Sequence, residues 1–200
     1  MRMFFFGDSN TYGHGLPDCV TPEMNPGPVP SKMGWAYRVA TMSNAEYINL
    51  ASPGSSNIEI LEALRYSDVA SNDTVIVQWS YHTRDCILGP DRMRISPWVR
   101  NELTEYFYAL HTDADLRERT VLAMEHAALW LSHMGARWVF TTVVHESLPD
   151  HISDLIHDHM ERFNKDKCID GVHPGLESNE IWANKMMEFL DSEQRMLRLR

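Results

Sequence analysis

The feature that most constrains the fold is a short apolar run at the start of the chain, residues 1–6, which ends at Gly7. Apolar and polar residues do not alternate along it, which is typical of a parallel strand buried on both faces. Residues 74–79, Thr-Val-Ile-Val-Gln-Trp, give the clearest strand signal in the chain. Because parallel strands are joined by crossover connections that cover the sheet, we expect helices on both faces of these strands.

The rest of the chain alternates between strand-like and helix-like segments. Further strands are predicted at 46–51 and 137–144, and residues 167–169 fit a short final strand or extended piece. Helices are predicted over five segments: 33–42, 58–69, 116–134, 150–164 and 176–190. This order predicts an α/β fold, a flavodoxin-like three-layer α/β/α sandwich with a central parallel sheet, in a single domain over residues 1–200.

Two segments interrupt the alternation. Residues 16–31 contain five prolines and little periodicity, which predicts an irregular loop. Residues 85–113 are long and mixed, and the pairs Gly-Pro at 89–90 and Ser-Pro at 96–97 break any regular element. We expect this second segment to form a small insertion or a lid beside the functional site.

The charge of the chain bears on its partners. With 28 acidic and 18 basic residues the formal net charge is −10, and the basic residues are scattered apart from the last few. Nucleic-acid binding draws on clustered Lys and Arg side chains that contact phosphates, so we expect no nucleic-acid partner.

Targeting signals and cysteines bear on the compartment. No window approaches the roughly 18 uninterrupted apolar residues of a membrane span, and no charged start leads into an apolar leader with a small-residue cleavage site. We therefore expect no membrane partner and a cytoplasmic location for the chain as given. Three cysteines without a Cys-x-x-Cys pair favour free thiols in reducing surroundings.

The two ends of the chain supply a serine, an acid and a histidine. Ser9 follows the first predicted strand, and Asp170 and His173 lie in one loop before the last predicted helix. A hydroxyl is a poor nucleophile unless a base takes its proton and a third group orients that base. Ligand sites in such folds lie beyond the carboxyl ends of the strands, so we expect the three side chains to meet at that edge of the sheet.

Three segments resemble a known family. Residues 7–13, Gly-Asp-Ser-Asn-Thr-Tyr-Gly, resemble the Gly-Asp-Ser block of the GDSL/SGNH hydrolases, and residues 170–173 resemble their closing Asp-x-x-His block. Between them, residues 49–54 resemble the second block of the family. The resemblance implies the SGNH hydrolase fold and assigns the catalytic roles to Ser9, Asp170 and His173. It also implies an oxyanion hole that includes the backbone N–H groups of Ser9 and Gly54.

The fourth block departs from the family pattern. After residues 74–79 the family has Gly-x-Asn-Asp, whose asparagine is the third oxyanion donor, whereas this chain has Ser-Tyr-His-Thr-Arg-Asp at 80–85. His82 aligns with the asparagine, and either its ring N–H or the guanidinium of Arg84 is a candidate for the missing donor. The alternative is that neither points inward and the hole consists of the Ser9 and Gly54 amides alone.

The activity implied by the resemblance is that of a serine esterase acting through an acyl-enzyme on short-chain or O-acetyl esters of carbohydrates. Asp8 and Asn10 are expected to support the loop of Ser9. The partner would then be a small-molecule ester or an acylated glycan. Two alternatives remain open: a non-catalytic sugar- or partner-binding module on the same fold, since a fold does not fix a function, and an acetyltransferase using the same triad.

No metal or organic cofactor is expected. Seven histidines between residues 111 and 159 form no His-x-x-x-His or His-Glu-x-x-His pattern, so we interpret them as solvated or capping side chains. Cys168, two residues before Asp170, suggests a competing thiol nucleophile. A free cysteine more often behaves as a small buried apolar residue, which favours Ser9.

Overall fold

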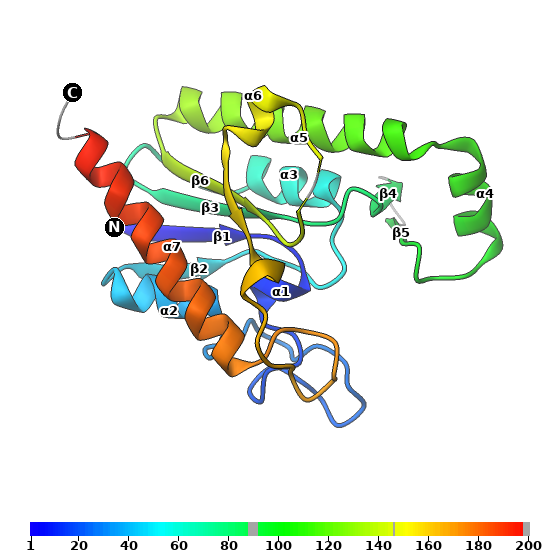
Figure 1. The fold of residues 1–200 in the computed structure, drawn as a ribbon, viewed down its shortest axis with the longest axis horizontal. Coiled ribbons are helices and arrows are strands. Elements are labelled where there is room, and N and C mark those ends of the chain that lie inside the picture. Colours follow the sequence, from blue (N-terminus) through cyan, green and yellow to red (C-terminus); the bar gives the residue numbers. More distant parts are fainter. Residues whose placement is uncertain (88–91, 146, 198–200) are drawn as a thin grey trace.

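A computed structural model describes residues 1–87, 92–145 and 147–197. Its centre is a five-stranded parallel sheet with the strand order β2-β1-β3-β6-β7 (Figure 1). The strands, in that order, are Glu46–Asn49, Arg2–Phe6, Thr74–Trp79, Arg137–Thr142 and Ile156–His159. The two segments with the strongest apolar signal, β1 and β3, thus lie in the middle of the sheet, where both faces are covered.

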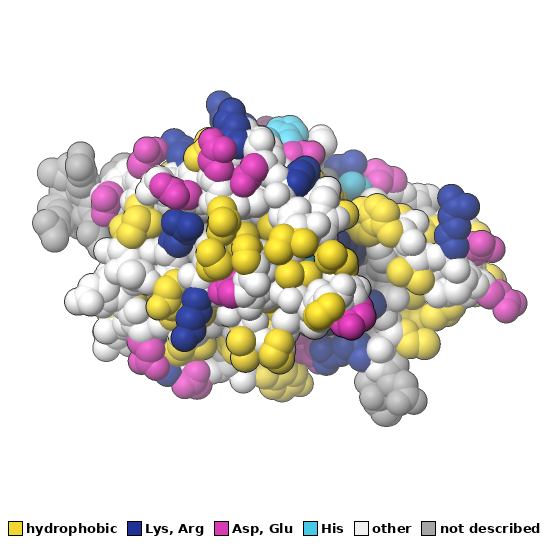
Figure 2. Space-filling view, turned by 90° about the horizontal axis from the view of Figure 1, so that it is seen from below, with side chains coloured by type: hydrophobic (Ala, Val, Ile, Leu, Met, Phe, Trp, Pro, Cys, Tyr) yellow, Lys and Arg dark blue, Asp and Glu magenta, His cyan; other side chains and the backbone are white. Residues whose placement is uncertain are grey.

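Helices cover both faces of the sheet. α2 (Trp35–Met42) and α7 (Leu176–Leu197) lie on one side, and α3 (Asn57–Arg65) and α5 (Asp113–Met134) lie on the other (Figure 1). The predicted three-layer α/β/α sandwich with a central parallel sheet is therefore confirmed. On the face seen in Figure 2, acidic, basic and apolar side chains are interspersed.

β1 divides its side chains between two apolar cores, as the period of two along a strand requires. Phe5 packs edge-on against Trp35 of α2, with ring centroids 5.6 Å apart, in the core that α7 closes with Trp182. Phe4 and Phe6 belong to the opposite core, beneath α3 and α5. Burying a Phe side chain contributes about 2–3 kcal/mol, so β1 anchors both layers.

The helix predicted over 150–164 is wrong. This segment instead forms a short helix α6 (Asp150–Ser153), the edge strand β7 and a 3₁₀ helix η1 (Met160–Phe163). Pairing with β6 overrides the local preference, because Phe140 and Thr142 pair with Ile156 and His159 and Thr141 Oγ1 donates to the carbonyl of Asp158. Residues 167–169 add no strand to the sheet, since Lys167 forms only an isolated bridge with Pro174.

The segment predicted as an insertion leaves the sheet after β3. It carries a two-stranded antiparallel hairpin, β4 (Asp85–Ile87) with β5 (Met93–Ile95), and α4 (Glu102–Leu110), all at one end of the molecule in Figure 1. The Gly-Pro pair at 89–90 lies outside the described residues. A role as a lid stays a prediction. No described helix combines the length and apolar character needed to cross a membrane.

Candidate active site

Ser9 is held at the carboxyl end of β1 by the sharp entry into α1 (Ser9–Tyr12). The Asp8 carboxylate caps α1 by accepting the Asn10 backbone N–H at 2.9 Å, and Gly13 ends it in the left-handed region. Gly7 has no room for a side chain, because a Cβ there would lie 2.2 Å from Thr11 Oγ1. The residues on either side of Ser9 therefore fix the position of its hydroxyl group at the carboxyl end of β1.

Asp170 and His173 are held in the loop between η1 and α7. The Asp170 Oδ1 accepts the backbone N–H groups of Val172 and His173 at 2.9 and 3.0 Å, so the loop turns around its own carboxylate. The base of the loop is fixed by Asp166, which accepts the N–H groups of Glu177 and Ser178 at the start of α7. Both catalytic candidates therefore sit on a preorganised turn.

The structure brings Ser9, His173 and Asp170 together. His173 Nε2 lies 2.8 Å from Ser9 Oγ, and His173 Nδ1 lies 2.5 Å from Asp170 Oδ2. A carboxylate only accepts, so Nδ1 carries the proton and Nε2 keeps a lone pair for the Ser9 O–H. Burial alone would raise the pKa of Asp170, but the hydrogen bonds from His173 and from the Val172 and His173 amides outweigh it and lower that pKa.

A cavity of about 430 Å³ opens over Ser9 and His173. Its lining consists of Ser9, Asn10, Tyr81, Arg84, Trp98, Val143, Met160, Glu161, Asn164, Lys167, Val172, His173 and Pro174. Sequence reasoning had not singled out the aromatic wall of Tyr81 and Trp98, whose rings meet edge to face at 5.3 Å. It also missed Met160, Glu161 and Asn164, because a single helix was predicted over residues 150–164.

Arg84 lies in this cavity and is tied to the loop of Ser9. Its Nη1 donates to Asp8 Oδ2 at 2.7 Å and to Ser80 Oγ at 3.0 Å, and its guanidinium carbon lies 5.0 Å from the ring centres of both Tyr81 and Trp98. Asp8 is fully buried and also accepts the Asn10 side-chain amide. Asp8 thus connects the nucleophile loop with the segment after β3.

The other two oxyanion candidates lie elsewhere. His82 Nε2 is 2.7 Å from Asp113 Oδ1 at the start of α5, and the bond from His82, followed by that from Arg117, lowers the pKa of Asp113. Gly54 adopts a φ of +80° in an exposed turn, and a Cβ at this position would lie 3.5 Å from Arg94 Nη1. Among the described residues that line the cavity, neither His82 nor Gly54 is present.

The competing thiol is poorly suited to attack. Burial, followed by the nearby charge of Asp170, raises the pKa of the Cys168 thiol to about 12, and its Sγ donates to the Pro174 carbonyl at 2.8 Å. Little thiolate is present at neutral pH under these conditions. Ser9 therefore remains the better nucleophile candidate.

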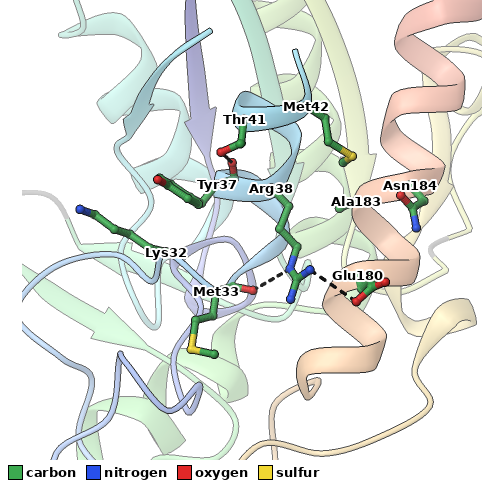
Figure 3. A pocket seen from close by; sticks show the side chains of 9 residues that line it. All are labelled: Lys32, Met33, Tyr37, Arg38, Thr41, Met42, Glu180, Ala183 and Asn184. Atoms are coloured by element: carbon green, nitrogen blue, oxygen red, sulfur yellow. Dashed lines mark hydrogen bonds and ion pairs between the residues drawn. The ribbon is translucent and has the colours of Figure 1, made fainter. Parts of the chain in front are cut away.

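A second cavity, of about 380 Å³, lies between α2 and α7 (Figure 3). Arg38 crosses it and donates to the Met33 carbonyl at 3.0 Å and to Glu180 at 3.4 Å. Its lining contains no Ser, Cys or His among the described residues. Of the two cavities, the first is therefore the one lined by a candidate nucleophile and a candidate base, Ser9 and His173.

Comparison with known proteins gives the fold. No protein-family model and no curated protein matches the chain, but solved structures do. An acetyl xylan esterase from Butyrivibrio proteoclasticus matches at a TM-score of 0.59 and 13% identity, covering 96% of this chain and 64% of its own. This chain therefore spans less than two thirds of that esterase.

Two further solved structures match most of their own length. A GDSL-like lipase from Bacteroides thetaiotaomicron matches at a TM-score of 0.52 and 13% identity, with 96% of this chain and 88% of the lipase covered. A psychrotrophic esterase from Pseudoalteromonas matches at 0.52 and 8%, with 97% and 98% covered. Together with the parallel sheet and its two helical layers, these matches give the chain the α/β/α fold of GDSL/SGNH-type esterases.

Proposed function

We propose that the protein is a serine esterase that acts through an acyl-enzyme on short-chain or O-acetyl esters of carbohydrates. The observation that carries the proposal is a continuous chain of hydrogen bonds beside an open cavity. His173 Nε2 lies 2.8 Å from Ser9 Oγ, His173 Nδ1 lies 2.5 Å from Asp170 Oδ2, and Ser9 and His173 line the cavity. Nucleophile, base and orienting acid are the three roles that acyl transfer needs.

The reaction proceeds in two halves. His173 Nε2 takes the Ser9 proton as Oγ attacks the ester carbonyl, and the same proton passes to the leaving alcohol when the tetrahedral intermediate collapses. Water then enters, gives a proton to Nε2 and attacks the acyl-Ser9 ester, which releases the acid and restores the hydroxyl. Asp170 holds the imidazole in the correct tautomer and stabilises the imidazolium formed in each half.

The oxyanion that forms in each half needs donors. The family resemblance assigns the backbone N–H groups of Ser9 and Gly54 to this role. Of these two residues Ser9 lines the cavity and Gly54 does not, so we assign the backbone donor to Ser9. Of the two side chains considered for the third donor, Arg84 lines the cavity while His82 is bonded to Asp113, so we assign the role to Arg84. Removal of one such donor typically costs about 10²–10³ in turnover.

The lining of the cavity supports a carbohydrate ester. Trp98 and Tyr81 offer flat apolar surfaces, and Glu161, Asn164 and Lys167 offer polar groups beside them, a combination that suits a ring bearing hydroxyls. One solved structure with the same fold is that of an acetyl xylan esterase. A substrate with a short acyl group on a sugar therefore fits best.

Hydrolysis of p-nitrophenyl acetate and release of acetate from acetylated xylan test the proposal. We expect the unmodified chain to hydrolyse both, and Ser9→Ala and His173→Ala each to lose at least about 10³ of the turnover, because the residues act as one unit. Cys168→Ala is the matched control and should keep its activity. Full activity of Ser9→Ala, or none in the unmodified chain, would refute the esterase proposal.

A further inference from the structure

A second imidazole lies beside the proposed base. His14 follows Gly13, the residue that ends α1, and its ring centroid is 4.6 Å from that of His173. Its neighbours Gly13 and Gly15 adopt φ angles of +83° and +87°, and a Cβ at Gly15 would lie 2.6 Å from Asp170 Oδ2. The Gly-His-Gly sequence thus places the Gly15 backbone against Asp170 and the His14 ring against His173. The esterase mechanism makes no use of His14.

The hydrogen bonding of His14 leaves one ring nitrogen for a ligand. Its Nε2 lies 3.1 Å from the Met24 carbonyl oxygen, which only accepts, so Nε2 carries the proton and Nδ1 of the neutral ring keeps its lone pair. A metal-binding histidine typically donates its other N–H to a backbone carbonyl or a carboxylate, which fixes the tautomer. His14 already has this arrangement.

Asp170 and His173 are two further candidate ligands, at a distance from His14 that suits binding of one metal ion. His14, Asp170 and His173 each offer one ligand atom, and the three atoms lie within 4.8 Å of one another. Over the parts of the chain that the structure describes, no other three His, Cys, Asp or Glu side chains meet this spacing. Two imidazoles with one carboxylate form a typical three-ligand set for Zn²⁺ that leaves a fourth position open. The three residues are partly exposed, so an ion can reach them.

We propose that Zn²⁺ binds to His14, Asp170 and His173 and reversibly switches off the esterase; the inhibitory part rests on the proposed function. If the metal takes His173 Nδ1, the ring proton moves to Nε2, and if it takes Nε2, that lone pair is consumed. In either arrangement His173 keeps no lone pair for the Ser9 proton. The metal here is an inhibitor of the triad and has no part in the reaction.

Binding is tested without substrate. Metal-free full-length chain is titrated with ZnCl₂ by calorimetry, alongside Ser9→Ala, His14→Gln and His145→Gln. We expect one site, with the same affinity in Ser9→Ala, because Ser9 is not a ligand. Outer-sphere partners of a metal contribute about 10–100-fold to affinity, so loss of the His14 ligand should weaken binding by at least about 100-fold. His145 pairs with His159 in a separate histidine cluster, with ring centroids 5.3 Å apart, and serves as the matched control.

Inhibition is tested by ester hydrolysis, with each variant normalised to its own rate in EDTA. ZnCl₂ should inhibit the unmodified chain and His145→Gln at the same concentration, EDTA should restore the rate, and His14→Gln and His14→Asn should need at least about 100-fold more metal. Equal binding and inhibition in the His14 variants, or an effect of His145→Gln instead, would overturn the proposal. Zinc binding that depends on His14 in a chain without esterase activity would refute the proposed function and leave the metal site standing.

Discussion

The buried ion pair of Arg84 and Asp8 gives a sharp prediction about the framework of the site. Asp8 is fully buried and the Arg84 side chain is 13% exposed, with Nη1 and Oδ2 2.7 Å apart. Removing one partner of a buried pair typically costs about 3–5 kcal/mol, because the other charge is left uncompensated. Asp8 keeps hydrogen bonds from Asn10 and Ser80, so we expect Arg84→Ala to lose about 3 kcal/mol, at the lower end.

Urea and thermal unfolding measure this loss. For a chain of this length 1 kcal/mol corresponds to roughly 2–4 °C, so Arg84→Ala should lower the Tm by about 6–12 °C. Lys185→Ala is the matched control, because Lys185 and Glu188 form an exposed pair that should contribute less than about 1 kcal/mol.

A double-mutant cycle identifies the cause. Asp8→Asn removes the buried charge, so the combined Asp8→Asn and Arg84→Ala variant should be less destabilised than the sum of the two single variants by at least about 1 kcal/mol. Additive losses, or a loss in Arg84→Ala no larger than that in Lys185→Ala, would refute the reasoning that Arg84 neutralises a buried Asp8.

Three further predictions concern the loop that carries the acid and the base. Gly15→Ala should destabilise the fold and lower turnover, measured by Tm and ester hydrolysis, because its Cβ would meet Asp170 Oδ2; unchanged values would contradict the close approach. Asp170→Asn should lower kcat by about 10⁴ while Ser9 stays in place, because the amide no longer holds His173 in the tautomer with its proton on Nδ1. A mild effect would contradict the role of Asp170 in orienting His173. Burial would raise the pKa of Asp166, but its hydrogen bonds with Ser178 and the Glu177 amide outweigh burial and lower that pKa. The Asp166 carboxylate therefore stabilises the fold above about pH 4, and this contribution is lost as the pH falls through the lowered pKa of the folded state. Asp166→Asn should therefore flatten the dependence of Tm on pH in this acidic range; an unchanged slope would contradict it.

The sequence predicted the centre of the sheet and missed its edge. β1 and β3 are buried along almost their whole length, and their mainly apolar residues without alternation are typical of a parallel strand covered on both faces. β7 reads Ile-His-Asp-His, which carries no such signal, and its strand exists because β6 offers an unpaired edge. Information of this kind lies in the tertiary pairing and is absent from the local sequence.

The candidate site shows the same division. The resemblance to the family motifs, together with the rule that sites lie beyond the carboxyl ends of parallel strands, was enough to predict that Ser9, Asp170 and His173 would meet. Alignment placed His82 at the position of the family's donor, but the start of α5 supplies Asp113 as its partner. His14 was overlooked because its place beside His173 arises only when a loop some 160 residues later folds back onto Gly15.

The central claim is that Ser9 is an activated nucleophile, and covalent labelling tests it most directly. A fluorophosphonate forms a stable bond only with a serine whose proton is taken by a neighbouring base. One solved esterase with this fold is inhibited by a phosphonate. We expect one label per chain, mapped to Ser9 by peptide mass spectrometry, with none in Ser9→Ala and a strongly reduced rate in His173→Ala. Absence of labelling, or a label that persists in Ser9→Ala, would contradict the account.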